Sequence, residues 1–142
     1  MTASEMTLDR LAEFGAAWRR KDLDALMEFM TDDCEFRASV GPEPGAVFTG
    51  RDEVRRGFEL MLRFDEAAEG HGGVAFVDGR YGASQWSFRY PGPDGGTVEV
   101  RGCDIYEFDG DRIRLKDAYR KVLGEIDSRA VRGSGRPAAP VR

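Results

Sequence analysis

The sequence of 142 residues is long enough for one domain with a sizeable core and too short for two. Hydrophobic residues make up 41% of it and charged residues 33%, which is typical of soluble globular proteins. The formal net charge of −5 excludes nucleic acid as an expected main partner, because phosphate binding needs a basic surface.

Residues that often carry metal or covalent chemistry are sparse. Cys34 and Cys103 lie far apart, without the close Cys or His spacing of a metal site, so we expect no metal and two free thiols. His71, the single histidine, lies in a glycine-rich run and is interpreted first as a loop residue and second as a base on a mobile loop. No apolar run approaches the length of a membrane span, so we expect a cytoplasmic protein without a membrane partner.

The first half of the chain predicts three helices. Apolar residues at helical spacing indicate a first helix that begins after Thr7 and ends near residue 21. Asp22 is placed to cap a short second helix. A third helix is expected from residue 51 to about residue 64, and the sequence Thr49-x-x-Asp52 at its start resembles a capping box.

The rest of the chain predicts strands in antiparallel hairpins. Asp-Gly pairs that end at Gly79 and Gly110 stand between alternating segments, and glycine tolerates the positive φ of a tight hairpin turn. Strands are expected at residues 34–39, 74–77, 81–90, 97–108 and 112–121. The order of elements predicts an α+β domain over residues 1–125, with a cone-shaped, curved antiparallel sheet wrapped around three N-terminal helices. Residues 126–142 form an Arg/Pro/Gly-rich tail that we expect to be disordered.

Three segments resemble the nuclear transport factor 2-like, or SnoaL-like, superfamily. AWRRKDLDALMEFMTDDCEF resembles its helix-helix-strand opening, VGPEPGAVFTGRDEVRRGF its loop into the third helix, and RGCDIYEFDGDRIRLKDAYRK its closing hairpin. The resemblance covers residues 8–122 and implies the same cone fold. The superfamily includes ketosteroid isomerases, polyketide cyclases, dehydratases, an epoxide hydrolase and non-catalytic transport proteins, so the fold alone does not decide the reaction.

The chain departs from the superfamily enzymes at key positions. Where the isomerases have their general base, this sequence has Ala38, and where they have an oxyanion-hole tyrosine it has Phe14. Only their second oxyanion donor has a counterpart, Asp104. Because alanine cannot take a proton and phenylalanine cannot donate a hydrogen bond, the isomerase mechanism is not expected. Trp86 and Phe88 stand where the epoxide hydrolase has Arg and Asp, so that reaction is not expected either.

The resemblance also predicts which side chains face the inside of the cone. The concave face is expected to carry Trp86, Phe88, Asp104, Tyr106, Lys116, Ala118 and Arg120. Strand alternation then places Cys103, Ile105, Ile113, Leu115 and Tyr119 on the convex face, where we expect a second copy to cover them. Composition alone would turn this apolar set toward the helices, and a shift of one residue in register would invert the assignment.

These placements lead to a hypothesis of cofactor-free acid/base chemistry on a lipophilic, polyketide-like or cyclic carbonyl compound, as in cyclases, isomerases or dehydratases. Asp104 would give or take the proton, with Lys116 and Arg120 as electrostatic partners. The substrate-binding walls would be Phe14, Trp18, Phe58, Trp86, Phe88, Tyr106 and Ala118. Two alternatives stay open: the charges only neutralise each other and fix the sheet, or the protein is a non-catalytic ligand-binding or dimeric interaction module.

Overall fold

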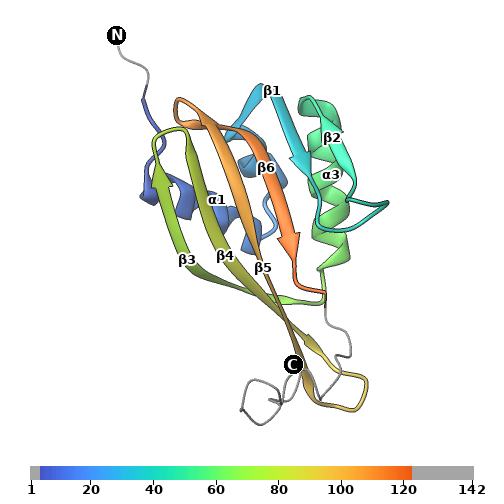
Figure 1. The fold of residues 1–142 in the computed structure, drawn as a ribbon. Coiled ribbons are helices and arrows are strands. Elements are labelled where there is room, and N and C mark those ends of the chain that lie inside the picture. The colour runs from blue at the N-terminus through green and yellow to red at the C-terminus, as the bar shows by residue number, and fades with distance from the viewer. Residues whose placement is uncertain (1–3, 123–142) are drawn as a thin grey trace, which may run out of the picture.

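A computed structural model describes residues 4–122 of the protein (Figure 1). Its elements, in order, are α1 (Leu8–Arg19), α2 (Leu23–Glu28), β1 (Met30–Arg37), β2 (Val47–Thr49), α3 (Arg51–Phe64), β3 (Glu69–Asp78), β4 (Tyr81–Pro91), β5 (Thr97–Asp109) and β6 (Arg112–Arg120). The tail predicted at residues 126–142 lies outside the described residues.

The strands form one six-stranded sheet in the order β2-β1-β6-β5-β4-β3. Neighbouring strands are antiparallel except β1 and β6, which run parallel and join the two halves of the chain. The sheet is curved, and α1 lies across its concave side (Figure 1). The predicted α+β architecture of a curved sheet around N-terminal helices is therefore confirmed.

The first two helices begin at their predicted caps. The backbone N–H of Arg10 donates to Thr7 Oγ1 over 3.1 Å, and that of Ala25 donates to Asp22 Oδ1 over 3.1 Å. Each bond satisfies an amide that would otherwise lack a partner at the helix start. The short α2 leads directly into β1, the strand that pairs with the closing strand β6.

The predicted capping box of α3 is wrong. Thr49 is the last residue of β2 and pairs with Glu35 of β1, so it is not free to cap a helix. Gly50 takes the capping position with a φ of +83° and no side-chain hydrogen bond. Glycine adopts this left-handed conformation at low cost, which explains how the chain turns directly from strand to helix.

Strand β3 is longer than predicted because its glycines belong to the sheet. Gly70 pairs with Phe88 and Gly72 pairs with Trp86 across β4, followed by a shift in register before Ala75. A Cβ at Gly70 would lie only 3.1 Å from Phe88 Cε1. The missing side chains thus leave space for the large rings of β4, a tertiary effect that overrides the low strand propensity of glycine.

The predicted convex face is right for most of its members and wrong for Ile113. Ile105 and Tyr119 are 43% and 55% exposed, on the side of the sheet opposite Asp104. Ile113 is fully buried in the core. A register shift between Glu107 and its neighbour on β5 pairs Ile113 with Phe108, another core residue, so strict alternation along the hairpin fails at this point.

Candidate functional site

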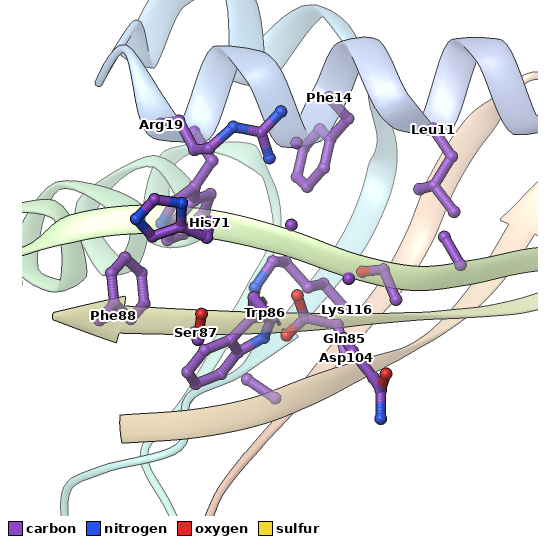
Figure 2. Close-up of a pocket in the computed structure, with 18 of the residues that line it drawn as sticks. Leu11, Phe14, Arg19, His71, Gln85, Trp86, Ser87, Phe88, Asp104 and Lys116 are labelled. Atoms are coloured by element: carbon purple, nitrogen blue, oxygen red, sulfur yellow. Dashed lines mark hydrogen bonds and ion pairs between the residues drawn. The ribbon is translucent and has the colours of Figure 1, made fainter. Parts of the chain in front are cut away.

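A cavity of about 230 Å³ lies between α1 and the concave face of the sheet (Figure 2). Nine of the ten predicted site residues line it: Phe14, Trp18, Trp86, Phe88, Asp104, Tyr106, Lys116, Ala118 and Arg120. Phe58 does not line it. Its fully buried ring packs edge-on against Trp18, with 5.0 Å between ring centroids, and so supports the wall from behind.

A buried ion pair stands at the centre of this cavity. Lys116 Nζ lies 3.1 Å from Asp104 Oδ1, and the two residues are only 4% and 5% exposed. The ammonium group also lies 4.4 Å from the ring centroid of Trp18 and 5.0 Å from that of Phe36. Paired charge and aromatic faces together offset the desolvation of the lysine.

Tyr106 completes a polar cluster with this pair. Its hydroxyl donates to Asp104 Oδ2 over 3.2 Å and lies 3.0 Å from Ser84 Oγ. Burial raises the pKa of Tyr106 well above its usual value, and the negative charge of Asp104 adds to the shift. The phenol therefore keeps its proton at neutral pH and acts as a hydrogen-bond donor inside the cavity.

Arg120 has a different partner from the one predicted. Its guanidinium pairs with Asp65, not with Asp104, at 3.0 Å from Nη2 to Oδ2. The Tyr90 hydroxyl also donates to Asp65, and burial, then this hydrogen bond, raises the pKa of Tyr90. The guanidinium carbon lies 5.3 Å from the ring centroid of Trp86. The cavity thus contains two separate charge pairs, and the sequence pattern revealed only the first.

The family model of the SnoaL-like domain matches residues 11–115. The chain belongs to the SnoaL-like domain family. The match covers most of α1 and all of β5, including Asp104 and Tyr106, and ends within β6, just before Lys116. The resemblance of the three sequence segments to this family is therefore confirmed.

Solved structures share the fold of this SnoaL-like domain. An NTF2-like protein of unknown function from Mesorhizobium loti is 23% identical, covering 80% of this chain and 89% of its own, with a TM-score of 0.65. A candidate polyketide cyclase from Xanthomonas campestris is 17% identical, covering 78% of this chain and 87% of its own, with a TM-score of 0.60. A hypothetical protein with a ketosteroid isomerase-like fold from Catenulispora acidiphila, in complex with trimethylamine, is also 17% identical, covering 80% of this chain and 86% of its own, with a TM-score of 0.63. No curated protein matches the chain. Identities this low show a shared fold only.

The prediction that His71 of this SnoaL-like domain lies in a loop is wrong. His71 belongs to β3 and lines the cavity. Its Nε2 lies 3.1 Å from Glu69 Oε1, but the geometry is not that of a hydrogen bond, so this buried nitrogen has no hydrogen-bond partner among residues 4–122. The neighbouring glycines Gly70, Gly72 and Gly73 line the cavity as well.

The two cysteines of the domain are poor nucleophiles. Burial raises the pKa of Cys34 and of Cys103, and the charges of Asp104 and Asp117 raise that of Cys103 further. Within residues 4–122 no three His, Cys, Asp or Glu side chains come together as a metal site. None of the helices described is long and apolar enough to cross a membrane.

Proposed function

We propose that this SnoaL-like domain is a cofactor-free acid/base enzyme acting on a lipophilic, polyketide-like or cyclic carbonyl compound. The observation that carries the proposal is the buried cluster of Asp104, Lys116 and Tyr106 inside an otherwise aromatic cavity. Its volume of about 230 Å³ lies below the usual range for drug-sized ligands, which favours a compact one- or two-ring substrate.

The three side chains supply the parts that proton transfer next to a carbonyl requires. The Asp104 carboxylate accepts a proton from the carbon beside the carbonyl, and the electrons of the broken C–H bond move onto the carbonyl oxygen. The Lys116 ammonium and the Tyr106 phenol are donors that stabilise the resulting enolate. Return of the proton to another carbon gives isomerisation. Attack of the enolate on a second carbonyl, whose oxygen takes up the proton held by Asp104, gives cyclisation. Departure of a β-hydroxyl that takes up the same proton and leaves as water gives dehydration.

This arrangement differs from that of the ketosteroid isomerases. Phe14 and Ala38, which stand at two of their catalytic positions, are 1% and 4% exposed and carry no group that can exchange a proton. The ring of Tyr106 lies 6.2 Å from that of Phe14, centroid to centroid, so a phenol enters the cavity from β5 and not from α1. The proposed base is accordingly Asp104, on the strand that also carries this phenol.

Proton exchange into a simple ketone tests the proposal without knowledge of the natural substrate. β-Tetralone is a compact bicyclic ketone, and NMR in D₂O follows the replacement of its α-hydrogens by deuterium. General acid–base catalysis predicts exchange about 100-fold faster or more with the protein than in buffer. Exchange at the buffer rate, at ketone concentrations that saturate binding, would remove the proposed activity.

A second candidate function is ligand binding without catalysis, and one specific observation favours it. Both oxygens of Asp104 already accept hydrogen bonds from Lys116 and Tyr106, so the carboxylate is partly satisfied before any ligand arrives. Binding of β-tetralone without exchange is the result that this function predicts.

We also propose that the protein forms a homodimer through the convex face. Phe76, Ala83 and Ile105 form a cross-strand row on this face, and Phe76 is 57% exposed. On β6 the residue opposite Ile105 is Asp117, and Tyr119, which is 55% exposed, lies on the same face opposite Cys103. Exposed apolar surface of this kind on a small domain is typical of an interface, and a two-fold dimer would cover it with its own copy.

A further inference from the structure

The cavity wall carries more positive than negative charge, although the whole chain is acidic. Its lysine and arginines are Arg19, Lys116 and Arg120, whereas its only carboxylates are Asp65 and Asp104. Lys116 and Arg120 are each paired with one of these carboxylates. Arg19 is therefore the one cation of the wall that makes no side-chain hydrogen bond or ion pair with any residue from 4 to 122.

The position of Arg19 follows from glycines on both sides of it. It lies in the last turn of α1, and its Nη1 is 3.4 Å from the points where Cβ atoms would stand at Gly15 and Gly72. Its Cγ lies equally close to such a point at Gly70. The side chain therefore packs between α1 and β3. Figure 2 shows it extending from the helix on the same side of the cavity as His71.

The acidic side chain at the start of β3 does not pair with this arginine. Glu69 precedes the glycines on β3, but its carboxylate is 75% exposed and lies against His71. Water screens an exposed charge of this kind strongly. An anion elsewhere in the cavity would meet Asp104 or Asp65, so the favourable place for negative charge is beside Arg19.

We propose that the ligand of this cavity carries a carboxylate that binds Arg19 at the β3 side. The planar guanidinium presents parallel N–H donors that match the two oxygens of a carboxylate. The remainder of the ligand then lies along the aromatic wall toward Asp104 and Lys116. Only this last part rests on the proposed function, in which the substrate is a carbonyl compound. The expected ligand class is thus a compact, lipophilic keto acid or a related aromatic carboxylate.

Paired neutral and anionic probes test the proposal. 2-Naphthoate and 2-naphthamide have the same ring system, but the first carries a negatively charged carboxylate where the second carries a neutral amide. Trp18 and Trp86 both line the cavity, so their fluorescence can report binding, with isothermal titration calorimetry as a second measurement. A charge-assisted hydrogen bond predicts that the wild-type protein binds the carboxylate about tenfold more tightly than the amide.

Two neighbouring arginines provide a matched pair of variants. Arg19→Gln should remove the preference for 2-naphthoate while leaving the affinity for 2-naphthamide unchanged. Arg20→Gln should leave both affinities unchanged, because Arg20 lies outside the cavity wall, near Asp22. Both substitutions are at exposed positions, so neither is expected to prevent folding.

Three results would overturn the proposal: failure of 2-naphthoate to bind, equal affinities of the wild-type protein for the two probes, or an undiminished preference in Arg19→Gln. The measurement concerns binding only. Absence of deuterium exchange into β-tetralone would therefore leave it standing, and loss of the carboxylate preference would leave the exchange chemistry standing.

Discussion

Asp104 and Lys116 form an ion pair of 3.1 Å in which almost no part of either side chain reaches water. The two residues come from adjacent strands, where Asp104 stands opposite Ala118 and Lys116 stands opposite Tyr106. The register of β5 and β6 thus brings these two charged side chains together on one face of the sheet. This relationship makes stability and proposed catalysis depend on the same atoms.

Removal of one partner of this pair should destabilise the fold strongly. Lys116→Met leaves the Asp104 carboxylate buried without its cation, which typically costs about 3–5 kcal/mol. The double variant Asp104→Leu/Lys116→Met should recover most of that loss, because it leaves no charge unpaired. Urea unfolding measures both free energies. A double variant as unstable as Lys116→Met would show that unpaired charge is not the cause.

Alkaline stability should depend on Tyr106. Because the folded protein holds the pKa of Tyr106 well above the usual value of 10.0, the unfolded chain loses this proton first as the pH rises. The stabilisation is fully present below pH 10.0 and is lost as the pH rises toward the folded pKa. Above pH 10.0 the free energy of unfolding should therefore fall less steeply with pH in Tyr106→Phe than in the wild-type protein. The two slopes should differ by about 1.4 kcal/mol per pH unit. Parallel curves for the two proteins would contradict the shift.

Gly102 should tolerate no larger residue. It pairs with Trp86 on β4, and a Cβ would overlap both the Trp86 ring and the backbone oxygen of Tyr119. Gly102→Ala should therefore destabilise the protein by about 1–3 kcal/mol, as overpacked positions do. Gly96→Ala is a suitable control, because a Cβ there would lie 3.3 Å from the Asp94 side chain in an exposed loop. Equal thermal stability of the two variants would show that the sheet relaxes around the added methyl group.

The residues around Asp104 could be placed from the sequence because the chain resembles a known fold and the strand pattern is consistent with that fold. The resemblance to the superfamily placed Asp104 and Tyr106 on the concave face, and the alternation of strand side chains agrees with it, because the two residues lie on one side of β5. Lys116 follows from the same alternation on the next strand. The same alternation would place any charged side chains at these positions inside the cone. The pattern therefore predicts a charged cavity but does not predict a reaction.

The parts that the sequence did not predict depend on contacts between distant segments. Asp65 ends α3 and meets Arg120 from the last strand, and nothing in the local sequence links the two. Ile113 was assigned to the wrong face because a register shift in β5 is invisible to simple alternation. Gly70 and Gly72 signal a loop by propensity, yet pairing with aromatic residues of β4 makes them part of a strand.

The proposed dimer predicts a clear effect of charge on the convex face. Ile105→Lys should convert a dimer into a monomer in sedimentation velocity experiments, because a lysine at the centre of the interface cannot be covered without loss of hydration. Leu60→Lys on α3 is the matched control, since Leu60 is 46% exposed outside this face. A monomeric wild-type protein, or dimers in both variants, would rule out this interface.

The proposed chemistry depends most on Asp104 as the group that accepts a proton from the ligand. Deuterium exchange into β-tetralone, compared between Asp104→Asn and Asp117→Asn, tests this directly. Both changes replace a β-strand carboxylate by its amide, but Asp117 contacts Tyr119 and Arg37 on the other face of the sheet. Circular dichroism establishes that each variant is folded at the assay temperature.

If Asp104 is the base, Asp104→Asn lowers the exchange rate by about 100-fold or more, whereas Asp117→Asn retains the wild-type rate. Equal exchange rates in the two folded variants would contradict this role.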